Sequence, residues 1–255
     1  MFSLFLLNGL KFNEKYMKYT DLLVGGLCLF CACSSPQKNP IDYVDPFIGT
    51  GFHGHTYPGA TTPFGAVQLS PDTRRGNWDA SSGYHYSDST ILGFSHTHLS
   101  GTGCQDLGDV LLRPTTQPVR LEGEGDIFLP AAFSHDSEKA TPGYYAVTLA
   151  DEQIKVELAA STFAGMHRYS YLNDKDASVI VDLTHILNTD DFIYEAELKQ
   201  TADNEIVGMR RTRSWVDNQY IYFVLQFSKP IQEWQQLNDK QGVAHFGQER
   251  EVLAK

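Results

Sequence analysis

The second half of the chain is a succession of short apolar runs separated by polar turns, and this pattern constrains the fold most strongly. The runs are rich in β-branched and aromatic residues, and polar and apolar residues alternate at 154–158 and 167–171. Alternation with a period of two places one set of side chains on each face of a strand. We therefore expect strands over residues 144–149, 154–160, 163–171, 178–183, 193–199, 206–213 and 220–227. Successive strands without helical spacing between them predict an all-β fold, an antiparallel β-sandwich.

The first half of the chain has a different texture. Residues 43–112 are crowded with Gly, Pro, His, Ser and Thr, which indicates long loops around short strands at 66–70 and 109–113. The sandwich should therefore carry long Gly/His-rich loops. The last residues, 251–255, resemble the start of a strand, and the sequence leaves open whether the last strands of the sandwich are missing.

Residues 1–33 are predicted to be an export signal. Lys15 and Lys18 precede a short apolar stretch that ends in small residues before Cys33, the layout of a secretory signal. Because Met17 directly precedes Lys18, translation is expected to start there. The segment is similar to a bacterial lipobox, so Cys33 is the expected lipidation site, with cleavage near Ala32 and release as the alternative. The chain should then be an exported, periplasmic or cell-surface bacterial lipoprotein held at the membrane by a lipid anchor.

Residues 34–41 form a polar tether, and residues 42–255 form the folded domain. Three of the four cysteines lie in the signal, so Cys104 remains alone and an internal disulfide is excluded. The chain has a formal net charge of −11, which argues against nucleic acid as a partner.

Two clusters in the first half contain residues that suit a binding site. His53 and His55 lie in a glycine-rich loop, where alternate histidines suggest a metal site, although hydrogen bonds to loop carbonyls are the preferred interpretation. Trp78 is followed by Asp79. An exposed indole can cover the apolar face of a sugar while the carboxylate accepts from its hydroxyls. A buried Trp with a turn-capping Asp is equally compatible with this pattern.

A third cluster follows at residues 93–109. It contains a second pair of alternate histidines, His96 and His98, then Cys104 in a glycine-rich stretch, and then Asp106 and Asp109. No specific histidine is paired with Cys104, which argues against a cysteine hydrolase. The stretch also lacks the lysine and the following helix of a phosphate loop.

Together these stretches resemble the amino-terminal signature of glycoside hydrolase family 92. The resemblance is carried in order by residues 43–51 (YVDPFIGTG), 58–60 (PGA), 63–65 (PFG), 68–73 (QLSPDT), 83–86 (GYHY) and 93–109, and more weakly by 133–135 and 142–145. It implies a bacterial exo-α-mannosidase that is calcium-dependent and inverting. In that family an amino-terminal β-sandwich precedes an (α/α)6 barrel, and both parts line the pocket for mannose-containing glycans.

The resemblance also implies that this chain is catalytically incomplete. No helical stretch able to start the barrel is present, so the (α/α)6 catalytic barrel is expected to be absent, together with the catalytic acid and base and most calcium ligands. An inverting glycosidase needs one carboxylic acid for the leaving group and a second carboxylate for the water. The residues carried over as substrate-binding candidates are Trp78, Asp79, His98 and Cys104. The missing barrel would be the partner of this domain.

Two alternatives remain at this point. The chain could be a free-standing surface carbohydrate-binding module that uses Trp78 and the histidine loops as a sugar platform. It could instead be a small metal enzyme built on the two pairs of alternate histidines.

Overall fold

The computed structural model describes residues 38–119, 127, 129–173 and 175–255. The predicted export signal with Cys33, and residues 34–37 of the predicted tether, lie outside the described residues. The chain divides into two compact units, Met1–Tyr43 and Val44–Lys255. In the described part of the first unit, a 3-10 helix, η1, covers Pro40–Tyr43. Over the described ranges, the structure has no helix with the length and hydropathy of a membrane span.

The larger sheet of the second unit contains seven strands among the described residues, and each neighbouring pair is antiparallel. Val181 in the middle of this sheet pairs with Leu112 on one side and Gly242 on the other. The order across the sheet is β1 (Ala60–Thr61), β2 (Gln68–Asp72), β4 (Gly93–Ser95), β5 (Leu111–Thr115), β11 (Ala177–Asp182), β16 (Gln241–Gly247) and β15 (Glu233–Asn238).

The second sheet has five strands in the described chain and is also antiparallel. Alternation is clear in its central strands, where Ile154, Val156 and Leu158 are buried and the residues between them are more exposed. The order is β17 (Glu251–Ala254), β10 (Gly165–Tyr171), β9 (Ile154–Ala160), β8 (Tyr144–Leu149) and β7 (Lys139–Thr141).

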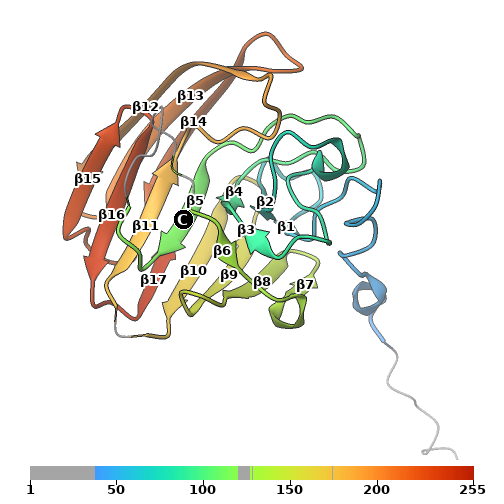
Figure 1. The fold of residues 1–255 in the computed structure, drawn as a ribbon, viewed down its shortest axis with the longest axis horizontal. Helices are drawn as coiled ribbons and strands as arrows, with labels where there is room; N and C mark the ends of the chain where they lie inside the picture. The colour runs from blue at the N-terminus through green and yellow to red at the C-terminus, as the bar shows by residue number, and fades with distance from the viewer. Residues whose placement is uncertain (1–37, 120–126, 128, 174) are drawn as a thin grey trace, which may run out of the picture. The chain divides into compact units, whose positions relative to one another are not determined.

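Two smaller sheets complete the unit. A three-stranded antiparallel sheet contains β12 (Phe192–Ala202), β13 (Glu205–Arg213) and β14 (Gln219–Gln226), and a two-stranded sheet contains β3 (Thr90–Ile91) and β6 (Ala131–Ala132). Two single-turn 3-10 helices, η2 (Trp78–Ala80) and η3 (His135–Ser137), lie in the loops. Figure 1 shows the strands of these sheets and the long connections near β1–β4.

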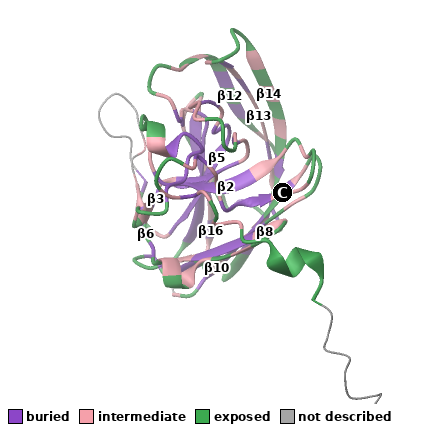
Figure 2. Cartoon of the chain, turned by 90° about the vertical axis from the view of Figure 1, so that its right-hand side faces the viewer, coloured by how far each residue is buried: buried purple, intermediate pink, exposed green. Residues whose placement is uncertain are grey.

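The sheets share one hydrophobic core, which makes the unit a sandwich. Leu112 and Val179 of the larger sheet, Val156 and Tyr169 of the second sheet and Leu225 of the three-stranded sheet belong to the same buried cluster. Figure 2 shows β2 and β5 largely buried, whereas β14 has exposed positions along its length. The all-β, antiparallel sandwich with long Gly/His-rich loops expected from the sequence is thus confirmed.

Candidate functional site

The glycine-rich loop that contains His53 and His55 is a tight turn. The Gly54 N–H donates to the Gly51 carbonyl and the Thr56 N–H donates to the Gly49 carbonyl. A Cβ at Gly54 would lie 2.1 Å from the Gly49 carbonyl oxygen, so this close approach of two backbone segments requires glycine. The turn folds the two histidines back toward η2.

Trp78 and Asp79 lie on η2, opposite these histidines. Asn77 caps the helix by accepting a hydrogen bond from the Asp79 N–H at 3.0 Å. The Asp79 carboxylate lies 2.5 Å from His53 Nδ1, which donates to it. The Trp78 ring centroid is 5.3 Å from that of His53 and 4.3 Å from that of His55. Because Trp78 remains 55% exposed, its indole is available at the surface beside a carboxylate.

Two glycines of the third sequence cluster, residues 93–109, lie against His55 and Trp78. The Gly101 N–H donates to the His55 carbonyl at 2.6 Å. A Cβ at Gly103 would lie 3.1 Å from the His55 ring and 3.5 Å from Trp78 Nε1. The structure therefore brings the three clusters together around Trp78. We call His53, His55, Trp78 and Asp79 the Trp78 cluster.

Backbone strain is concentrated in the same loops. Six non-glycine residues of the described chain have positive φ, and five of them lie between residues 52 and 110. They include His55 at 56° and the β-branched Val110 at 56°. Such conformations cost about 1–3 kcal/mol each and gather at functional sites. Their position supports a functional role for these loops.

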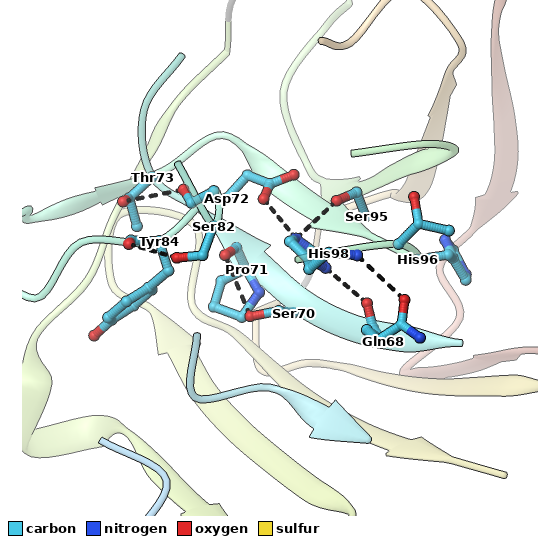
Figure 3. Close-up of polar contacts among 12 residues, drawn as sticks. Gln68, Ser70, Pro71, Asp72, Thr73, Ser82, Tyr84, Ser95, His96 and His98 are labelled. Carbon is cyan, nitrogen blue, oxygen red and sulfur yellow. Dashed lines mark hydrogen bonds and ion pairs between the residues drawn. The ribbon is translucent and has the colours of Figure 1, made fainter. Parts of the chain in front are cut away.

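His98 lies in the interior rather than at the surface of the loops. Its Nδ1–H donates to the Gln68 carbonyl at 2.7 Å, and its Nε2 lies 2.8 Å from Asp72 Oδ1 and 3.0 Å from Ser95 Oγ. Figure 3 shows these contacts. Both ring nitrogens of His98 thus face oxygen atoms. Tyr57 packs against it, with ring centroids 5.1 Å apart.

The partner of His98 is a fully buried carboxylate, Asp72. Its second oxygen lies 2.8 Å from Nε2 of His185. Burial alone would raise the pKa of Asp72, but the charges and hydrogen bonds of His98 and His185 outweigh it and hold the pKa well below its usual value. His185 was not predicted as a site residue. It follows a buried strand by three residues, and a histidine soon after such an apolar run was the only local signal.

Asp106 and Asp109 are also buried and serve as anchors for other elements. Asp106 Oδ2 accepts from the Trp215 N–H at 3.3 Å, and Asp109 Oδ1 lies 3.4 Å from Nε of the buried Arg210. Asp109 Oδ2 accepts from Thr97 Oγ1 at 2.8 Å. These contacts tie the third sequence cluster to β13 and to the turn that follows it.

Cys104 lines a cavity of about 470 Å³ beside the Trp78 cluster. Burial, with the nearby carboxylates of Asp106 and Asp191, raises the pKa of its thiol. A raised pKa disfavours the thiolate that a cysteine nucleophile requires. The structure therefore agrees with the sequence argument against a cysteine hydrolase.

The two pairs of alternate histidines do not converge. His53 faces Asp79, His96 faces His167, and His98 faces Asp72. No group of three His, Cys, Asp or Glu side chains in the described residues is placed to hold a metal ion. These residues do not fit a resident calcium ion, and the donor set offers no support for a small metal enzyme.

Comparison with known proteins gives a consistent family. Residues 43–252 match the Glycosyl hydrolase family 92 N-terminal domain. A curated relative, an uncharacterized secreted glycosidase of Arthroderma benhamiae, is 28% identical over 193 residues, which are 68% of this chain and 24% of the relative.

Solved structures are similar as well. The family GH92 α-mannosidase BT3965 from Bacteroides thetaiotaomicron, in complex with mannoimidazole, has a TM-score of 0.76 and 35% identity over 84% of this chain and 31% of its own. The GH92 family glycosyl hydrolase ccman5 has a TM-score of 0.71 and 27% identity over 85% and 32%. This chain thus spans about a quarter of the curated relative and about a third of the solved structures. The match over residues 43–252 shows that the chain belongs to glycosyl hydrolase family 92 and contains its N-terminal domain.

Proposed function

We propose that this chain is the amino-terminal substrate-pocket domain of a calcium-dependent, inverting exo-α-mannosidase that acts on mannose-containing glycans. The observation that carries the proposal is the Trp78 cluster, an exposed indole fixed beside a carboxylate. The indole would cover the apolar face of a mannose ring, and Asp79 would accept hydrogen bonds from its hydroxyls. The solved relative crystallised with mannoimidazole supports mannose as the sugar.

The chemical step is assigned to residues outside this chain. An inverting site holds two carboxyl groups about 6.5–9.5 Å apart, with a water between one of them and the sugar. In the Trp78 cluster, Asp79 is already paired with His53, while Asp72, Asp106 and Asp109 are buried. We therefore infer that the acid, the base and most calcium ligands come from an (α/α)6 barrel, the partner that this domain would complete. When bound, calcium would polarise oxygen atoms of the substrate.

The test is sugar binding by the purified 255-residue chain, measured by calorimetric titration with methyl α-mannoside. We expect binding that weakens at least about tenfold in Trp78→Ala, because the aromatic platform is lost. Trp78→Phe should retain part of the affinity, and the exposed Phe163→Ala should match the unchanged chain. Unaltered binding by Trp78→Ala would refute the assigned site. Release of mannose by this chain alone would refute its dependence on a barrel.

A second candidate is a free-standing carbohydrate-binding module at the cell surface. It is favoured by the buried core, which contains residues of all four sheets described in the second unit. The two candidates separate when a barrel of this family is added in trans. Calcium-dependent mannose release by the mixture supports the mannosidase domain, whereas sugar binding without any gain in turnover supports the module.

We also propose that the chain is exported and anchored through Cys33. The signal-like layout of residues 1–33 and the secreted relative support export. In a bacterial host, labelling with an alkyne fatty acid should modify the unchanged chain and not Cys33→Ser. Equal labelling of both would refute the anchor, and Cys104→Ser serves as the matched control.

A further inference from the structure

The cavity beside Cys104 is built by two segments that are distant in sequence. One is the turn that leads into β12, residues 188–192, and the other is the β13–β14 turn, residues 213–215. Hydrogen bonds hold both in place: the Asp191 N–H donates to the Asn188 carbonyl at 3.0 Å, and the Trp215 N–H donates to Asp106 at 3.3 Å. The cavity therefore has fixed walls.

The walls combine exposed aromatic rings with polar groups. Trp215, in the β13–β14 turn, is 68% exposed, and Phe192, the first residue of β12, is 57% exposed. Asp190, Asp191 and Arg213 also line the space. Exposed large aromatic side chains that gather around a cavity mark a binding surface.

One polar atom of the cavity lacks a partner. Asp191 Oδ1 is buried and has no hydrogen bond among the described residues, although the side chains of Ser214 and Asn188 interact with the same carboxylate. A buried acceptor without a partner is unfavourable, so a ligand hydroxyl that donates to the Asp191 carboxylate would stabilise the site. The neighbouring carboxylate of Asp190 disfavours an anionic ligand. A neutral ligand with hydroxyl donors and an apolar face fits both the carboxylates and the aromatic rings.

The cavity adjoins the Trp78 cluster. Cys104 lines the cavity, and the preceding residue, Gly103, packs against His55 and Trp78. Adjacent Cα atoms in a chain are about 3.8 Å apart. The two surfaces are therefore close enough for linked units of one ligand to contact both.

We propose that the cavity between residues 188–192 and 213–215 is a second sugar subsite, with Trp215 as its aromatic platform and Asp191 as an acceptor for a sugar hydroxyl. The inference rests on the proposed function, because the first sugar unit is assigned to the Trp78 cluster. It extends that function from one mannose to a glycan of at least two linked sugars.

The test compares methyl α-mannoside with an α-linked mannobiose in titrations of the full 255-residue chain. The disaccharide should bind about tenfold more tightly than the monosaccharide, the size of one added aromatic contact. Trp215→Ala should remove this advantage and leave the monosaccharide affinity within about twofold, whereas Trp78→Ala should weaken both sugars. Trp215→Phe should retain part of the advantage. Phe163→Ala, another exposed aromatic change, is the matched control.

The outcomes distinguish failure of the second subsite alone from failure of the proposed function. A disaccharide advantage that persists in Trp215→Ala overturns the subsite, as does equal affinity of the unchanged chain for both sugars. If the unchanged chain binds neither sugar, the proposed function fails and the subsite fails with it. Circular dichroism of each variant distinguishes loss of binding from loss of fold.

Discussion

His96, which is half-buried, and His167, which is buried, form a pair whose hydrogen bonds require both rings to be neutral. His96 Nδ1–H donates to the Val110 carbonyl at 2.7 Å, so its Nε2 accepts from His167 Nε2–H at 3.0 Å. His167 Nδ1 then accepts from the Tyr169 hydroxyl at 2.8 Å. A proton added to His96 would place two N–H groups against each other. Each ring is thus satisfied only without a charge.

This pair predicts a loss of stability in mild acid. Burial lowers the pKa of His96 from 6.5 to about 4 and, together with the charge of His96, lowers the pKa of His167 well below 6.5. Below pH 6.5 the two histidines bind protons in the unfolded chain but not in the folded chain. Their contribution to the free energy of unfolding is therefore fully present above pH 6.5 and is lost as the pH falls toward 4. The free energy of unfolding should fall by about 1.4 kcal/mol per pH unit for each histidine.

Urea unfolding at several pH values between 4 and 7 measures this slope. His167→Gln should reduce the slope by about half, whatever its effect at neutral pH, because one of the two groups no longer titrates. Met166→Gln changes an exposed residue next to His167 that does not titrate, and it should keep the slope of the unchanged chain. Equal slopes for His167→Gln and the unchanged chain would show that the pH dependence of stability does not come from this histidine pair.

The candidate site residues also show which features of the site could be predicted from the sequence. The sequence left open whether Trp78 is exposed beside Asp79 or buried, and the structure exposes it on a short helix that Asn77 caps. The partners of His98 are Gln68 and Asp72 of β2 and Ser95 at the end of β4. Its interior position depends on strand pairing across the sheet, which no local pattern reveals. Its assigned role in substrate binding stays a prediction, as do those of Trp78, Asp79 and Cys104.

At the scale of elements, the strands that could be predicted are those whose sequences contain a clear apolar run. The bounds expected for β8 and β9 agree with the structure; β9 alternates between core and surface, whereas β8 is buried along most of its length. β15 was not expected: its sequence EWQQLN has few apolar residues, as suits a strand at the sheet edge. β16 was not expected either, because it is buried almost continuously, contains glycine and lacks an alternating pattern.

The last strand, β17, yields a prediction at the same scale. Val252 and Ala254 are fully buried, and β17 pairs with β10 so that Val252 lies opposite Tyr169. Removal of residues 251–255 would expose this apolar surface and the backbone groups of β10. We expect a loss of at least about 2 kcal/mol in the free energy of unfolding, from one buried Val and several hydrogen bonds.

Thermal and urea unfolding of the shortened chain check this expectation. Glu251→Ala changes an exposed residue of the same strand and should alter stability by less than about 0.5 kcal/mol. A shortened chain as stable as the unchanged one would show that β10 does not depend on β17.

At the scale of the whole molecule, the Val44–Lys255 unit should unfold in one cooperative transition. Its size exceeds that of most two-state domains, but one buried cluster contains residues of the seven-, five- and three-stranded sheets. No sheet can therefore separate without exposing the core of the others. Trp215 reports on the β13–β14 turn, and Trp234 reports on β15 at the far edge of the larger sheet.

Two variants that each keep a single tryptophan test whether unfolding is one cooperative transition. One carries Trp78→Phe and Trp234→Phe and keeps Trp215, and the other carries Trp78→Phe and Trp215→Phe and keeps Trp234. In each chain, the fluorescence midpoint in urea should coincide with the midpoint of the strand signal in circular dichroism. An earlier midpoint for Trp215 alone would mean that the three-stranded sheet unfolds first. In that case the proposed second sugar subsite would stand on the least stable part of the domain, and bound mannobiose should move that midpoint toward the other.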